Sequence, residues 1–210
     1  MGWCFARLYD FLTSRTEDAG LRDWRRTLLQ RARGRTVEVG SGTGANLPFY
    51  TDAVDTVFAT EPDRHMRRRL AARAEQIAAP PIEVVDAGAE RLPYESGSID
   101  TVVTTLVLCT VPDPMASLRE VMRVLRPGGE LLFLEHVAHL DPGVHKWQRR
   151  LEPFWRCFAE GCHLTRRTGE WMREVGFEVA DVCAARMPKA PAILPTIRGV
   201  ARKPGEASKA

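Results

Sequence analysis

The sequence lacks long hydrophobic runs and paired cysteines. No apolar stretch approaches the roughly 20 residues that span a membrane, and the start lacks the basic segment and apolar core of a signal peptide. The five cysteines are scattered, odd in number and never in a CxxC pair, which argues for a reducing compartment and against a disulfide framework. We therefore expect a cytoplasmic protein, for which Trp3 and Phe5 leave open a weak attachment to a membrane surface.

Strong charge of either sign is also missing. The net charge is +3 and the pI is about 8.7, values that do not demand a nucleic-acid partner. Basic clusters such as residues 67–69 are not interleaved with the aromatic side chains that nucleic-acid sites often use, so we expect no nucleic acid. With 210 residues, 44% hydrophobic and 27% charged, the chain suits one globular α/β domain.

Residues 36–47 hold three closely spaced glycines: Gly40, Gly42 and Gly44. Val37 and Val39 precede them and indicate a short buried strand that runs into a tight turn. Glycine lets a ligand approach the backbone closely, and we expect a helix to begin near Thr43 with its unpaired N–H groups facing the same crevice. The pattern predicts a nucleotide-type loop; the alternative is an ordinary strand–turn–helix with incidental glycines.

Two carboxylates suggest which nucleotide binds. Glu38, two residues before the first glycine, would repel a pyrophosphate but attract the ammonium and sulfonium groups of S-adenosylmethionine. Glu61 ends the next apolar run, about 20 residues after the loop, where an acid reaches ribose hydroxyls; the alternative is a surface acid in a turn. The third glycine also comes one residue earlier than in the dinucleotide fingerprint. S-adenosylmethionine is therefore the expected cofactor.

Apolar runs and helical periodicities alternate along the rest of the chain. We expect strands at residues 36–39, 56–60, 82–85, 99–106, 130–135, 177–182 and 195–201, and helices at 64–76, 114–125 and 168–175. This alternation predicts an α/β fold with a mostly parallel sheet and right-handed crossovers. Residues 1–35 are expected to form a helical cover, 36–202 the main domain and 203–210 a polar tail.

Several motifs together resemble a known family. Residues 37–44, Glu61 and the segments 89–94, 98–100 and 118–129 look like the class I, type 11 S-adenosylmethionine-dependent methyltransferase domain. Shorter motifs at residues 105–109, 134–137 and 161–166 resemble the methyltransferase-like 7 family, which is associated with methylation of small thiols. The resemblance implies a Rossmann-like fold with a seven-stranded, mostly parallel sheet flanked by helices, whose last strand is antiparallel, and a helical insertion after strand five.

The resemblance also implies roles for individual residues. Glu38, Gly40 and Gly42 would hold the methionine part of the cofactor, Glu61 the ribose and the Gly88–Ala89 loop the adenine. Many relatives place an acid directly before that alanine; Gly88 stands there in this chain, with Asp86 as the alternative partner for adenine. The rest of the expected cofactor set is Ser41, Gly44, Asn46, Pro62, Glu90, Thr105 and Leu106.

The aromatic-rich insertion at residues 138–168 follows the end of a strand, where ligands of open α/β sheets bind. We expect it to form an apolar acceptor pocket, although packing on the core explains any one aromatic equally well. The expected acceptor-binding residues are Tyr9, Trp147, Trp155 and Cys162.

His136 directly follows the fifth strand, at the expected reaction centre. It is the candidate general base, and a hydrogen-bonded structural histidine is the equal alternative. We expect no metal, because the spacing of Cys157, Cys162 and His163 does not match the usual zinc clusters.

The predicted function is methyl transfer from S-adenosylmethionine to a small apolar acceptor, expected to be a thiol. Alternatives are a lipid amine, a quinone- or phenol-type acceptor, and a catalytically silent binding protein. A nicotinamide oxidoreductase is disfavoured because no Tyr-x-x-x-Lys pair is evident. A nucleic-acid methyltransferase is disfavoured because Thr105-Leu106-Val107 stands where a Pro-Pro-Tyr type of motif would follow strand four.

Overall fold

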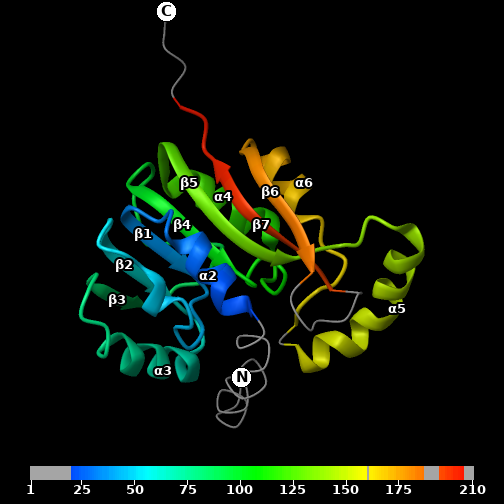
Figure 1. The fold of residues 1–210 in the computed structure, drawn as a ribbon, viewed down its shortest axis with the longest axis horizontal. Helices are drawn as coiled ribbons and strands as arrows, with labels where there is room; N and C mark the ends of the chain where they lie inside the picture. The colour runs from blue at the N-terminus through cyan, green and yellow to red at the C-terminus, as the bar shows by residue number, and fades with distance from the viewer. Residues whose placement is uncertain (1–19, 160, 187–193, 206–210) are drawn as a thin grey trace, which may run out of the picture.

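The computed structural model describes residues 20–159, 161–186 and 194–205, and one mixed β-sheet runs through them (Figure 1). Its seven strands lie in the order β3-β2-β1-β4-β5-β7-β6. β7 pairs antiparallel with both β5 and β6, and the other pairs are parallel. The bounds are β1 Gly34–Val39, β2 Val54–Thr60, β3 Ile82–Val85, β4 Ile99–Thr105, β5 Leu125–His136, β6 Glu178–Arg186 and β7 Pro195–Arg202. The predicted Rossmann-like fold class is confirmed.

Helices cover both faces of this sheet. α2 lies across one face, whereas α4 and α6 lie on the other and contact each other (Figure 1). The helical bounds are α2 Arg22–Leu29, the 3₁₀ helix η2 Leu47–Phe49, α3 Arg64–Ala74, α4 Pro114–Val124, α5 Pro142–Phe158 and α6 Thr168–Val175. Three aspartates fix helix starts by accepting backbone N–H groups in the first turn: Asp63, Asp113 and Asp141.

The sheet is buried on both faces, which explains its continuous apolar runs. Leu131 and Phe133 of β5 belong to the core beneath α4 and α6, whereas Leu132 and Leu134 belong to the core beneath α2 and α3. Successive side chains of a strand point to opposite faces, so burying all four requires helices on both faces of the sheet. This packing holds the carboxyl ends of the strands at one edge.

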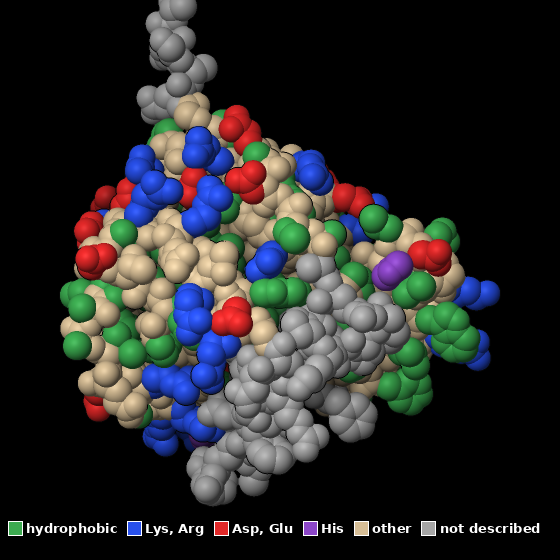
Figure 2. Space-filling view, viewed as in Figure 1, with side chains coloured by type: hydrophobic (Ala, Val, Ile, Leu, Met, Phe, Trp, Pro, Cys, Tyr) green, Lys and Arg blue, Asp and Glu red, His purple; other side chains and the backbone are tan. Residues whose placement is uncertain are grey.

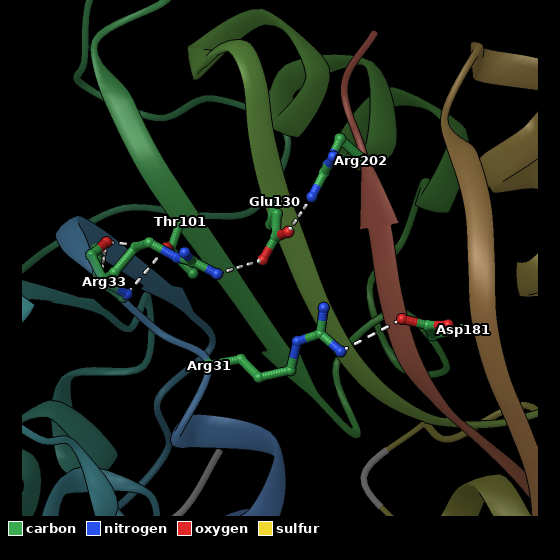
Figure 3. Close-up of polar contacts among 7 residues, drawn as sticks. Arg31, Arg33, Thr101, Glu130, Asp181 and Arg202 are labelled. Carbon is green, nitrogen blue, oxygen red and sulfur yellow. Dashed lines mark hydrogen bonds and ion pairs between the residues drawn. The ribbon is translucent and has the colours of Figure 1, made fainter. Parts of the chain in front are cut away.

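A polar cluster secures the opposite edge of the sheet (Figure 3). The buried Glu130 carboxylate of β5 pairs with Arg33 (3.4 Å) and with Arg202 of β7 (2.9 Å). Thr101 Oγ1 donates to the carbonyl oxygen of Arg33 at 2.9 Å, which fixes the entry into β1. These contacts lie away from the carboxyl ends of the parallel strands and leave that edge open.

Two local predictions are wrong. No α-helix begins near Thr43; the chain forms turns and then the short η2, because Gly42 and Gly44 have φ of +56° and +84°. A left-handed backbone interrupts the right-handed helix, and Pro48 lacks an N–H for helix bonding. β5 also begins at Leu125 rather than at residue 130, because Leu125 already pairs with Ile99 of β4.

The expected helical cover at residues 1–35 falls partly outside the described residues. α2 is helical as predicted, whereas Tyr9 lies in the segment 1–19, which the structure does not describe. Among the described residues, no helix is both long enough and apolar enough to cross a membrane.

Candidate functional site

A cleft of about 260 Å³ opens at the carboxyl ends of β1, β2 and β4. β1 pairs with β2 on one side and with β4 on the other, so the chain leaves neighbouring strands in opposite directions, which is where open α/β sheets bind ligands. Nine of the expected cofactor residues line it: Gly40, Gly42, Glu61, Pro62, Gly88, Ala89, Glu90, Thr105 and Leu106. The other lining residues are Val39, Met66, Val107, Thr110, Val111 and Pro112.

The three glycines of the loop do different things. A Cβ on Gly40 would lie 2.8 Å from a methyl carbon of Val107, and one on Gly44 would lie 2.9 Å from a methyl carbon of Leu47. These two glycines therefore permit close packing of the loop. A Cβ on Gly42 would meet nothing within 4 Å, although Gly42 lines the cleft. Gly42 thus leaves room for a ligand.

Glu61 stands at the end of β2 with its carboxylate held in place. One oxygen accepts the N–H of Gly42 at 2.8 Å, and the other accepts the N–H of Asp63 at 2.9 Å. Burial raises the pKa of Glu61, and these backbone N–H groups oppose that rise. Each oxygen keeps a second lone pair, so Glu61 can accept hydrogen bonds from a ligand in the cleft.

Glu38 does not line the cleft. Val37 and Val39 point into the core beneath α4 and α6, so Glu38, between them, points to the face that α2 covers. Its carboxylate accepts from Tyr50 Oη at 2.7 Å and from Asn46 Nδ2 at 3.1 Å. Burial raises the pKa of Glu38 to about 7, although the bond from Tyr50 lowers it.

A buried polar network links Glu38 to the cleft. Asn46 Nδ2 also donates to Thr105 Oγ1 at 2.9 Å, and Arg25 of α2 donates to both Asn46 Oδ1 and Thr105 Oγ1 at 2.9 Å. Asn46 therefore reaches the cleft only through Thr105. Arg25 was not among the expected site residues, because nothing in the sequence distinguishes this buried arginine from the exposed arginines of the same helix.

Three further expected residues lie outside the cleft. Ser41 and Gly44 do not line the cleft. The Ser41 N–H donates to the carbonyl oxygen of Thr60 and its hydroxyl to that of Glu38, so it is turned into the protein. Asp86, the alternative partner for adenine, also lies outside the cleft, where it pairs with Arg67 at 2.6 Å.

A buried acid that sequence analysis missed shapes the loop after β4. Glu135 of β5 is fully buried and accepts the N–H groups of Val107 and Cys109, each at 3.2 Å. Burial raises its pKa to about 7, and the backbone N–H groups oppose that rise. Leu106, at the start of this loop, has φ of +60°, a strained conformation for leucine that a rigid site can hold. An acid within an otherwise apolar strand is the signal that could have found Glu135.

Next to this loop lies a cluster of Cys109, His136 and Cys162. Cys162 Sγ lies 3.4 Å from His136 Nδ1, and the three ligand atoms all lie within 4.8 Å of one another. Hydrogen bonding with Cys109 and with His136 lowers the pKa of Cys162 to about 5, whereas that of Cys109 is raised well above its usual value. His136 Nε2 is buried with no hydrogen-bond partner among the described residues. The sequence placed His136 and Cys162 on the acceptor side but gave no reason to include Cys109.

The other two expected acceptor residues lie on α5, which projects away from the sheet (Figure 1). Trp147 is 59% exposed and Phe154 71%, and Figure 2 shows hydrophobic side chains gathered at this end of the molecule. Trp155 is half-buried, and its indole nitrogen is buried with no hydrogen-bond partner among the described residues. Neither tryptophan lines the cleft, and a role in acceptor binding stays a prediction for both.

Comparisons with known proteins find methyltransferases. Residues 37–133 match the family model described as methyltransferase domain. The human protein named thiol S-methyltransferase TMT1B is 38% identical over 155 residues, which cover 72% of this chain and 62% of that protein. Phosphatidylethanolamine N-methyltransferase of Cereibacter sphaeroides is 32% identical over 132 residues, 62% of this chain and 64% of that protein. The chain thus spans less than two thirds of the length of these relatives.

Solved structures show the same fold at low sequence identity. A crystal structure of a putative methyltransferase from Bacillus halodurans has a TM-score of 0.71 at 18% identity and covers 86% of this chain and 98% of that one. A geranyl diphosphate methyltransferase in complex with S-adenosylmethionine has a TM-score of 0.68 at 14% identity, with coverage of 88% and 85%.

Proposed function

We propose that this protein, whose residues 37–133 match the methyltransferase domain family model, methylates the thiol of a small molecule with S-adenosylmethionine as the methyl donor. The single observation that carries the proposal is the cleft lined by Gly42 and Glu61. Gly42 has no side chain to fill the cleft, and its N–H holds the Glu61 carboxylate in place. This pair offers space for the cofactor and acceptors for its ribose hydroxyls.

The charges around the cleft fit S-adenosylmethionine better than a dinucleotide. Among the described residues, the lining of the cleft includes two acids, Glu61 and Glu90, and no lysine or arginine. In a dinucleotide loop, a backbone N–H at this position would donate to the pyrophosphate. Here the N–H of Gly42 donates to the Glu61 carboxylate instead. A cationic ligand without phosphate is therefore favoured.

The chemistry of methyl transfer supports a thiol acceptor. The sulfonium of the cofactor carries an already activated methyl group, so the chain mainly has to align the nucleophile with it. A free thiol has a pKa near 8.5, so a few per cent of it is thiolate at neutral pH and a strong base is not required. The name of the human relative, thiol S-methyltransferase, supports the same class of acceptor.

A lipid amine is the second candidate acceptor. The relative named phosphatidylethanolamine N-methyltransferase favours it, as does the outer face of α5, where Trp147 and Phe154 are exposed. The two candidates share the cofactor cleft and differ in the acceptor alone.

An acceptor screen tests the proposal. The protein is incubated with methyl-labelled S-adenosylmethionine and size-matched panels of thiols, amines, phenols and phosphatidylethanolamine vesicles, and labelled product is counted. We expect product with small apolar thiols and calorimetric binding of S-adenosylmethionine but not of NAD. Product with amines or vesicles and none with any thiol would overturn the thiol assignment, and tight NAD binding without S-adenosylmethionine binding would overturn the whole proposal.

A further inference from the structure

The cluster of Cys109, His136 and Cys162 brings together three distant parts of the chain. Cys109 lies in the loop after β4, His136 is the last residue of β5, and Cys162 follows α5. Their side chains are 1%, 8% and 4% exposed, respectively. Two thiols and an imidazole thus meet in a place from which water is largely excluded.

Hydrogen bonds fix each of these segments. Glu135 accepts the N–H of Cys109, and the carbonyl oxygen of Cys109 accepts the N–H of His163 at 2.8 Å. The Arg166 guanidinium donates to the carbonyl oxygens of Leu108 and Val111 at 2.5 and 2.6 Å. The side chains of the cluster therefore project from backbone that is held in place, as a ligand site requires.

The spacing of the three ligand atoms suits a tetrahedral metal ion. Zinc binds thiolate sulfur at about 2.3 Å and imidazole nitrogen at about 2.0–2.1 Å, which puts neighbouring ligand atoms roughly 3.5–3.8 Å apart. Here Sγ of Cys162 and Nδ1 of His136 are 3.4 Å apart, and all three atoms lie within 4.8 Å of one another. Small side-chain rotations are enough to complete the geometry.

Charge balance favours the same conclusion. Two cysteine thiolates, a neutral imidazole and one divalent cation have a net charge of zero, so the loaded site would bury no uncompensated charge. Sulfur with nitrogen is also the ligand set that prefers zinc to magnesium or calcium.

We propose that Cys109, His136 and Cys162 form a binding site for Zn²⁺, whose fourth coordination position takes the thiolate of the acceptor. Three protein ligands with one open position are typical of zinc sites that bind a substrate. Val107 and Thr110, which belong to the same loop as Cys109, line the cofactor cleft, and the proposal places the fourth position on that side of the cluster. The acceptor would bind as the thiolate, a few per cent of which is present at neutral pH, so its proton is given up to solvent before the sulfur reaches the metal. The open-position half of this proposal rests on the thiol acceptor proposed above, whereas the metal site itself does not.

This site changes the interpretation of His136. A histidine whose Nδ1 binds zinc cannot accept the proton of the acceptor at that atom, so His136 positions the metal instead of acting as the general base. Along the sequence, Cys157, Cys162 and His163 do not have the spacing of a zinc cluster. The protein instead brings Cys162 to two residues that are distant from it in sequence.

Metal binding is tested on the full chain, reduced and stripped of metal, by titration with Zn²⁺ and, as a spectroscopic probe, Co²⁺. We expect about one equivalent bound, with a sulfur-to-cobalt charge-transfer band. Cys109→Ser and Cys162→Ser should each weaken binding at least tenfold. Cys157→Ser, which changes an exposed thiol on α5, is the matched control and should bind as the unaltered protein does.

Several results would overturn the metal site. One is absence of stoichiometric binding while mass spectrometry shows free thiols; another is a charge-transfer band that survives both cysteine substitutions. A Cys109–Cys162 disulfide that persists under reducing conditions would also overturn it. Circular dichroism and thermal unfolding of each variant show whether it is folded, and His136→Ala gives a further variant in case a serine variant is not.

The open position is tested by adding acceptors to the cobalt-loaded protein without S-adenosylmethionine. A small apolar thiol should intensify the charge-transfer band, whereas the alcohol of the same size should not. A spectrum unchanged by every thiol overturns the open position. Failure of the proposed function is distinguishable, because it would appear as absent thiol methylation in the acceptor screen even where the cobalt spectrum responds.

Discussion

At the scale of single residues, Gly42 decides whether the cleft is open. Its φ of +56° suits glycine, and aspartate is among the residues that best tolerate this region of backbone space. Gly42→Asp should therefore leave the fold nearly intact, while its side chain occupies the cleft beside Glu61 and adds a like charge. We expect S-adenosylmethionine to bind at least tenfold more weakly in calorimetry.

Gly128→Asp is the matched control for this substitution. Gly128 has φ of +75°, and nothing lies within 4 Å of a Cβ placed there, but it lies in β5 outside the cleft. Both variants should lose similar stability in urea unfolding, and only Gly42→Asp should lose cofactor affinity. Equal affinity of the two variants would show that the cofactor does not occupy the space beside Gly42.

A second residue-scale prediction concerns Glu38 and Tyr50. The pKa of Glu38 is raised to about 7 in the folded protein, from a usual value of 4.5. The folded protein thus binds more protons than the unfolded chain between these values, so this group favours folding at low pH. That contribution is lost as the pH rises through about 7. Ionised Glu38 then depends on its bond from Tyr50 Oη.

Tyr50→Phe should consequently destabilise the protein more at pH 8 than at pH 5. At pH 8 the variant loses a hydrogen bond to a charged group, worth about 1.5–3 kcal/mol, and at pH 5 a neutral one, worth about 0.5–1.5 kcal/mol. Urea unfolding at the two pH values measures the difference. The same loss at both would mean that Glu38 does not titrate in this range.

At the scale of elements, α5 carries two of the expected acceptor-binding residues and projects away from the sheet (Figure 1). Trp155 is half-buried on it, whereas Phe154, its neighbour, is 71% exposed. Trp155→Ala should change KM or kcat for the acceptor several-fold and leave the Kd of S-adenosylmethionine within about threefold. Phe154→Ala is the control, expected to change neither. An equal loss of cofactor affinity in Trp155→Ala would make that tryptophan a structural residue of the whole domain.

Most elements could be predicted because their signals are local. The β-branched run at Ile99–Thr105 and the helix that Gly176 ends with φ of +104° lie where the sequence placed them. The prediction of a helix near Thr43 was wrong because two glycines adopt left-handed φ values. Those values depend on how the loop packs against the rest of the protein, which the local sequence does not reveal.

At the scale of the whole molecule, the sequence predicted those residues of the candidate site that follow the ends of strands. It did not predict the residues whose position depends on how the side chains pack. Glu61 and Gly42 lie in the cleft because the order of strands puts their loops together. Glu38 failed to reach it because alternation along β1 turned its side chain to the other face. Cys109 joins His136 and Cys162 only in three dimensions, so no sequence spacing could have revealed that cluster.

The position of β7 has a consequence for how the protein is made. β7 follows β6 in the chain but is inserted between β5 and β6, and it bonds to both. During synthesis on the ribosome, the leucine-rich β5 therefore emerges long before the strand that covers its edge, and an uncovered strand edge is a template for aggregation. A chain that ends before residue 195 would leave the edge of β5 uncovered, and we expect it to aggregate more readily than the full chain.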